Sequence, residues 1–167
     1  MPFSIQDKSV NEQDPNYDLV IFWVNGFGEL LIAGVDYFSD DVLDKNVKQH
    51  DSRTVLSKLA SAALYMERGF PTRPKVVEDT YLSTPYGEAL LRVYMAEKGS
   101  MQISAMGRRP TAADTFDTLI AVIVVLQKNN FIYVMAENDN EGQGTDRNKE
   151  ALKREAQAFF SSIVVHR

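Results

Sequence analysis

The strongest constraint on the fold is the uninterrupted apolar run Leu119–Leu126. A strand with one solvent-exposed face alternates polar and apolar side chains, so this run predicts a central strand buried on both faces. It is far shorter than the roughly 20 apolar residues that cross a bilayer, and we therefore expect a soluble chain without a membrane span. The turn Lys128-Asn129-Asn130 and a second apolar run, Phe131–Ala136, predict that the chain returns as an antiparallel partner.

A second hairpin is predicted nearer the N-terminus. The run Asp18–Val24 is rich in β-branched and aromatic residues, and Asn25-Gly26 separates it from the strand-like run Glu29–Phe38. An Asn-Gly pair between two such runs is a strong hairpin signal.

The length of 167 residues suits one domain with a sizeable core. Residues 1–17 are polar and are predicted to form an N-terminal arm, with a short edge strand at Phe3–Ile5. The remainder, residues 18–167, is predicted to form a single domain.

Two amphipathic helices are predicted. Ser52 is a candidate N-cap for a helix over Arg53–Arg68, and Gly69 is suited to end it. Asp146 is a candidate cap for a second helix that ends at about Ser162. The predicted inward faces are Val55, Leu56, Leu59, Ala62, Ala63 and Met66 in the first helix, and Leu152, Ala156, Phe159, Phe160 and Ile163 in the second.

Further strands are predicted between the helices, at Val76–Leu82, at Glu88–Glu97 and, as a short element, at Gln102–Met106. The order of hairpin, helix, several strands and helix predicts an α+β fold. We expect an antiparallel sheet with an N-terminal hairpin, packed by two main helices at about 53–68 and 146–162.

The charge distribution disfavours nucleic-acid binding. The chain carries 18 Lys and Arg against 23 Asp and Glu, for a net charge of −5. Residues 1–50 hold nine acids and three bases, a net charge of −6, and the basic pairs Arg73/Lys75 and Arg108/Arg109 are isolated. A duplex-binding protein needs a concentrated basic surface to displace counterions.

The lack of cysteine excludes thiol catalysis, disulfides, iron–sulfur clusters and Cys-ligated zinc. It fits an extracytoplasmic bacterial protein, periplasmic or lipoprotein-derived if an export signal has been removed, although cytosolic proteins also lack cysteine. His50 and His166, the only imidazoles, lie in polar sequence without a nucleophile elbow nearby, so both are predicted to be solvated. We assign no catalytic residue and expect no cofactor and no metal.

Three aspartates keep acid–base chemistry open. Asp36, Asp114 and Asp117 flank apolar runs, where burial can raise the pKa of a carboxyl group. The competing interpretation is that they form turns by bonding to their own backbone.

The segment Asp139–Glu150 has part of the spacing of a calcium loop, with Gly144 at the sixth position and Glu150 at the twelfth. Glu141 and Gln143 stand where short ligands are normal, and the preceding segment is β-like. These departures favour an acidic loop that leads into a helix. Gly26-Phe27-Gly28 lacks both the third glycine and the following helix of a dinucleotide loop, and it favours a hairpin turn.

Arg92, Arg108 and Arg109 are the candidate ligand-binding residues. Their guanidinium groups suit a phosphate or carboxylate, provided that the three converge in the fold. The alternative is a solvated loop that pairs with the acidic N-terminal third.

The second half of the chain resembles the PsbP-like family, which includes the extrinsic protein of the oxygen-evolving complex and bacterial extracytoplasmic and nuclear-transport relatives. The resemblance lies in the strand pair Thr118–Leu126 and Phe131–Glu137, the polar loop after it, and the terminal helix that ends in Phe159-Phe160-Ser161-Ser162-Ile163-Val164-Val165. It covers Tyr86–Val165 and implies an antiparallel sheet sandwiched by helices in a small non-catalytic protein that binds partners or assists assemblies. It places no functional residue on this chain.

We therefore expect a non-catalytic binding or assembly-accessory domain that binds a protein partner or small ligand through its sheet edge or through the loops Asp40–Asp51 and Gly107–Asp114. One alternative is a small enzyme that uses carboxylates and arginine. Another is an inhibitor or immunity-type protein whose acidic N-terminal third complements a basic target. The sequence leaves the oligomeric state open, and a dimer is compatible with it.

Overall fold

The computed structural model of the chain describes residues 4–10, 17–23, 30–47, 49–67, 73–97, 117–139 and 145–163. The strands are β1 (Ser4–Val10), β2 (Tyr17–Trp23), β3 (Leu30–Tyr37), β4 (Lys75–Thr84), β5 (Gly87–Ala96), β6 (Thr118–Gln127) and β7 (Asn130–Asp139). The helices are α1 (Asp40–Asn46), α2 (Ser52–Glu67) and α3 (Thr145–Ser162).

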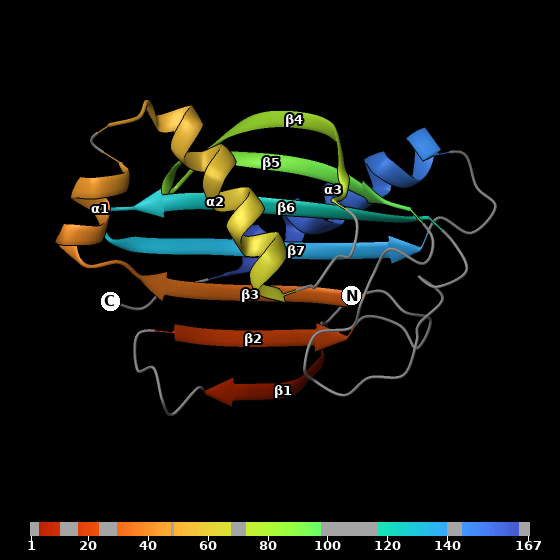
Figure 1. Cartoon of the computed structure of the whole chain (residues 1–167). Coiled ribbons are helices and arrows are strands. Elements are labelled where there is room, and N and C mark those ends of the chain that lie inside the picture. Colours follow the sequence, from red (N-terminus) through yellow and green to blue (C-terminus); the bar gives the residue numbers. More distant parts are fainter. Residues whose placement is uncertain are drawn as a thin grey trace.

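The strands form one sheet in the order β1-β2-β3-β7-β6-β5-β4, in which every neighbouring pair is antiparallel (Figure 1). The predicted α+β class is confirmed. The long apolar run forms β6, which lies between β5 and β7 and is buried from Thr118 to Val125. None of the described helices combines the length and apolarity that crossing a membrane requires.

The sheet is covered on both faces, by α2 on one and by α3 on the other (Figure 1). Side chains that alternate along β5, β6 and β7 supply two separate cores, because successive residues of a strand point to opposite faces. Leu90 and Ile120 face α2, whereas Leu91 and Ile123 face α3. The predicted inward face of α3 is confirmed, since its four buried members and the partly buried Ile163 all pack on the sheet.

The start of α2 differs from the prediction. The cap is the side chain of Asp51, not Ser52: its Oδ1 accepts hydrogen bonds from the backbone N–H groups of Arg53 (3.1 Å) and Thr54 (3.0 Å). Hydrogen bonds from Thr54, the largest cause, lower the pKa of Asp51. A carboxylate satisfies two free N–H groups at once, so it replaces the serine hydroxyl in this role.

The inward face of α2 is also rotated from the predicted one. Ala60 and Leu64 are buried together with the predicted Val55, Leu56 and Ala63, whereas the predicted Ala62 is exposed. The small side chains of Ala60 and Ala63 allow the helix to approach the sheet closely.

The N-terminal hairpin has the predicted strands, since β2 and β3 pair from Tyr17↔Asp36 to Trp23↔Leu30. Its Asn25-Gly26 turn, the predicted strand at 102–106 and the predicted end of α2 at Gly69 lie outside the described residues. The predicted arm contributes β1, which pairs with β2 and is longer than the expected edge strand at Phe3–Ile5.

A close contact joins β3 to β7. Gly34 lies opposite Tyr133, and a Cβ atom at position 34 would lie 2.3 Å from Cζ of the tyrosine ring. The fully buried ring therefore lies over the glycine on the α2 face, and any larger residue there must displace it.

Candidate functional site

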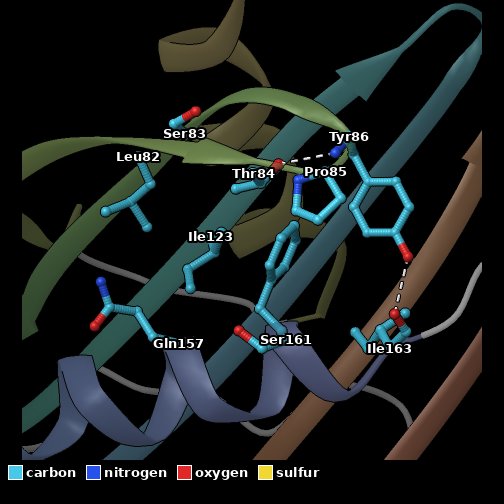
Figure 2. A pocket seen from close by; sticks show the side chains of 10 residues that line it. Leu82, Ser83, Thr84, Pro85, Tyr86, Ile123, Gln157, Ser161 and Ile163 are labelled. Atoms are coloured by element: carbon cyan, nitrogen blue, oxygen red, sulfur yellow. Dashed lines mark hydrogen bonds between the residues drawn. The ribbon is translucent and has the colours of Figure 1, made fainter.

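A cavity of about 300 Å³ lies between the β4–β5 hairpin and the last turns of α3 (Figure 2). Three elements distant in sequence form it: the hairpin, the middle of β6 and the end of α3. The described residues that line it are Leu82, Ser83, Thr84, Pro85, Tyr86, Ile123, Gln157, Phe160, Ser161 and Ile163.

The hairpin wall is held by a tight turn. Thr84 pairs with Gly87, so Pro85 and Tyr86 are the two connecting residues. Gly87 has φ +119°, a conformation that favours glycine. The Thr84 hydroxyl accepts a hydrogen bond from the Tyr86 N–H (3.2 Å) and donates one to the Gly87 carbonyl (2.8 Å), which fixes the turn from inside.

Tyr86 connects this turn to the end of α3. Its hydroxyl donates a hydrogen bond to the carbonyl of Ile163 (2.9 Å; Figure 2). Its ring meets that of Phe160 edge-on, with 6.0 Å between the centroids. Carbonyl groups after the last helical turn lack intrahelical donors, so the tyrosine satisfies one of them. The two walls of the cavity are thereby held at a fixed separation.

The floor of the cavity is apolar and its rim is polar. Ile123 is fully buried and Phe160 is nearly so, whereas Leu82 and Ile163 are half-buried. On the rim, Gln157 is half-buried and Ser161 is exposed. A ligand group in this cavity would exchange water for apolar contact and still meet neutral polar side chains at the opening.

The described lining residues carry no formal charge at neutral pH, and a cluster of four paired charges lies further along β4 and α3. Glu78 of β4 accepts hydrogen bonds from Lys149 (2.8 Å) and from Lys153, one helical turn before Gln157. These hydrogen bonds lower the pKa of Glu78 to about 2, and the one that Lys153 donates to Glu78 raises the pKa of this lysine. Lys153 also contacts Glu150 at 3.2 Å. Within this cluster, Glu78 and Glu150 balance Lys149 and Lys153.

A second, smaller cavity of about 170 Å³ lies between α1 and α2. Its described lining is apolar apart from Lys58, and Val42 on α1 is 42% exposed. The predicted binding segment Asp40–Asp51 contributes Val42, Leu43 and Val47 to it. The first cavity is larger and adds neutral hydrogen-bonding groups, so it is the stronger candidate for a ligand site.

Arg92, the one predicted ligand-binding residue within the described part of the chain, lies on the opposite face of the sheet. Its Nε and Nη2 donate to the two carboxylate oxygens of Asp79 (2.7 and 2.8 Å), and its Nη1 donates to the carbonyl of Ser57 on α2 (3.3 Å). The hydrogen bonding that it donates to Asp79 raises the pKa of the arginine. Arg108 and Arg109 lie outside the described residues, so convergence of the three stays a prediction.

The remaining candidate residues lie away from the first cavity. Asp36 is half-buried near the end of β3, Asp117 is exposed before β6, and Asp114 is not described. His50 is exposed, with its Nε2 2.7 Å from Nζ of Lys58, and His166 is not described.

In the predicted calcium loop Asp139–Glu150, Asp139 ends β7 and residues 145–150 form the start of α3, whereas residues 140–144 lie outside the described residues, so the loop stays untested. The Gly26-Phe27-Gly28 turn also lies outside them. Within the described ranges, no group of three or more His, Cys, Asp or Glu side chains is placed to hold a metal ion.

Comparison with known proteins adds no further constraint at the site. No protein-family model matches the chain, and no curated protein matches it. The resemblance to PsbP-like proteins stays a prediction, and the function is argued from the geometry of the cavity.

Sequence reasoning missed the residues of this cavity. The available signal was on α3, where Gln157 and Ser161 are neutral polar residues at i and i+4, beside an apolar stripe and among charged neighbours. The other wall could not be found from the sequence, because the contact of Tyr86 with Ile163 joins residues 77 positions apart.

Proposed function

We propose that this chain is a non-catalytic binding domain that holds a mainly apolar, uncharged group of a ligand between the β4–β5 hairpin and α3. The observation that carries the proposal is a cavity of about 300 Å³ with an apolar floor, a neutral polar rim and walls fixed by hydrogen bonds. Pockets that bind small molecules share this combination of apolar lining and few polar groups.

The volume limits the size of the bound group. Known ligand pockets begin at about 300 Å³, and an apolar cavity of about 150 Å³ is enough to hold benzene. One ring with a short substituent would therefore fit here.

The chemistry of the lining favours binding over the alternative of an enzyme. A serine nucleophile needs an adjacent general base, and the described lining holds Ser83 and Ser161 but no carboxylate or imidazole. The hydroxyl of Tyr86 already donates to a carbonyl. The carboxylate–arginine pair of Asp79 and Arg92 lies on the other face of the sheet, where it links the sheet to α2.

The proposal is tested by screening a library of neutral one-ring fragments by methyl NMR. We expect the methyl signals of Leu82, Ile123 and Ile163 to shift for a subset of the fragments, with Leu43 and Leu59 in the second cavity as internal references. Ser161→Trp places an indole at the rim and should abolish these shifts.

The matched control is Ala158→Trp. Ala158 is exposed on the same helix and does not line the cavity, so this variant should bind fragments like the parent chain. No fragment shifting the three methyl signals, or equal shifts in Ser161→Trp, would refute the proposed function.

A further inference from the structure

We infer that the ligand group carries a neutral amide-like function beside its apolar part, and that Gln157 is the residue that recognises it. This inference rests on the proposed function and adds the chemical class of the ligand. The first step concerns which polar groups in the cavity are available to a ligand.

Two polar side chains of the lining are already used by the fold. The hydroxyl of Thr84 both donates and accepts within the turn, and the hydroxyl of Tyr86 donates to Ile163. Ser83 points away from α3 in Figure 2. These groups shape the cavity, and they leave recognition to the α3 side of the opening.

Gln157 and Ser161 are the polar side chains of the described lining that remain on that side, and Gln157 is the longer and more buried of the two. It projects from α3 close to Leu82 and Ile123 (Figure 2), and its side-chain amide makes no hydrogen bond to any other residue that the structure describes. The amide presents an N–H donor and a carbonyl acceptor side by side. A ligand with a donor and an acceptor in the same arrangement, as in a carboxamide, can pair with both.

Charge balance selects against ionic ligand groups. A carboxylate or an ammonium group in the cavity would lose hydration without meeting an opposite charge in the described lining. The nearby lysines, Lys149 and Lys153, are held by Glu78 and offer no free cation to an anion. A neutral ligand group avoids this cost.

Three probes of similar shape separate the contributions of amide hydrogen bonding, charge and apolar contact to binding: phenylacetamide, phenylacetate and isobutylbenzene. They share one ring and a branched end of similar size, but the end is a neutral amide, an anion or a hydrocarbon. Affinities are measured by methyl NMR titration for the parent chain, for Gln157→Met, and for Ala158→Met as a control on the exposed side of the helix. Methionine matches glutamine in length and suits a helix, so Gln157→Met should fold like the parent.

In the parent chain we expect phenylacetamide to bind at least about tenfold more tightly than phenylacetate, as unpaired burial of a charge requires. Gln157→Met should weaken phenylacetamide by about fivefold, the effect of one lost hydrogen bond. It should change isobutylbenzene by less than about twofold. Ala158→Met should change none of the three.

The outcomes distinguish this inference from the proposed function. If isobutylbenzene binds in the cavity but Gln157→Met leaves phenylacetamide unchanged, or if phenylacetate binds as tightly as phenylacetamide, the inference is overturned and the binding function stands. If none of the three probes shifts the cavity methyl signals, the proposed function fails with it.

Discussion

The two faces of the sheet are attached to their helices by adjacent residues of the same edge strand, in opposite ways. Glu78 and Asp79 of β4 point to opposite faces, as neighbours in a strand do. On the α2 face, the positively charged partner belongs to the sheet. Arg92 donates two hydrogen bonds to Asp79 and one to a backbone carbonyl of the helix. On the α3 face, the cations are Lys149 and Lys153 of the helix itself.

The two faces also differ in the space beside their helices, since the described cavity beside α2 has about 170 Å³ and the one beside α3 has about 300 Å³. On the α2 face, Ala60 and Ala63 let the helix lie close to the sheet, and the Tyr133 ring lies directly over Gly34. On the α3 face, flexible lysines join the helix to β4, and one turn further along, the helix and the hairpin enclose the cavity. We therefore expect substitutions on the α2 face to cost more stability than matched substitutions on the α3 face.

The largest effect is expected at Gly34. Gly34→Ala should lower the free energy of unfolding by about 3 kcal/mol, because the new Cβ must displace the buried Tyr133 ring. The expected clash is specific to position 34, because the Cβ of the neighbouring Ala33 lies on the α3 face, away from the Tyr133 ring. Urea unfolding measures the change, and combining Gly34→Ala with Tyr133→Leu should cost less than the sum of the two single variants. Strictly additive costs would show that the ring is not the obstacle.

The next effect is expected at Asp79. Asp79→Asn should cost about 2 kcal/mol, because it leaves the mostly buried Arg92 guanidinium without its carboxylate. Since Asp79 itself is 34% exposed, we expect less than the cost of breaking a fully buried pair. Urea unfolding of Asp79→Asn beside Glu78→Gln makes the comparison, and equal losses would contradict the proposed difference between the faces.

Glu78→Gln should have a smaller effect, of about 1 kcal/mol, because the partly exposed lysines can turn to water when their partner is lost. Thermal unfolding at neutral pH and two salt concentrations checks this, since the loss should shrink as salt screens the pair. A loss that exceeds the one at Asp79 would reverse the ranking of the two faces.

The same carboxylate predicts a pH dependence. The pKa of Glu78 is lowered to about 2 from 4.5, so its ion pairs stabilise the fold fully above about pH 4.5 and are lost as the pH falls through 2. The difference in unfolding free energy between the parent chain and Glu78→Gln should therefore shrink steadily from pH 5 to pH 2. A difference that stays constant over this range would show that the ion pairs do not provide the stabilisation.

The smallest effects are expected at the lysines. Lys149→Ala and Lys153→Ala should each cost about 0.5 kcal/mol, because the other lysine still neutralises Glu78. The double variant should cost more than the sum, since it alone leaves Glu78 unpaired. Additive losses would indicate two independent contacts.

Much of the fold could be predicted from local patterns. The apolar run of β6 predicted a doubly buried strand, and the stripe of Leu152, Ala156 and Phe159 predicted which side of α3 packs on the sheet. These elements follow from periodicity alone, because a residue's neighbours in sequence fix the face on which it lies.

The cavity could not be predicted in this way. It depends on the contact of Tyr86 with Ile163 and on the position at which α3 packs beside the hairpin. The sequence predicts that Arg92 binds an anionic ligand, but in the structure its guanidinium group pairs with Asp79 of the neighbouring strand. Only the register of β4 and β5 brings Asp79 opposite Arg92. Register and helix placement are properties of the whole sheet.

We propose above that the space between the β4–β5 hairpin and α3 receives a neutral ligand group. A crystal structure of the full chain soaked in phenylacetamide tests it most directly. We expect the ring to lie over Ile123 and Phe160, with the amide within hydrogen-bond distance of Gln157. A soaked crystal with a well-ordered hairpin and no ligand density in the cavity, or with the amide directed away from Gln157, would contradict it.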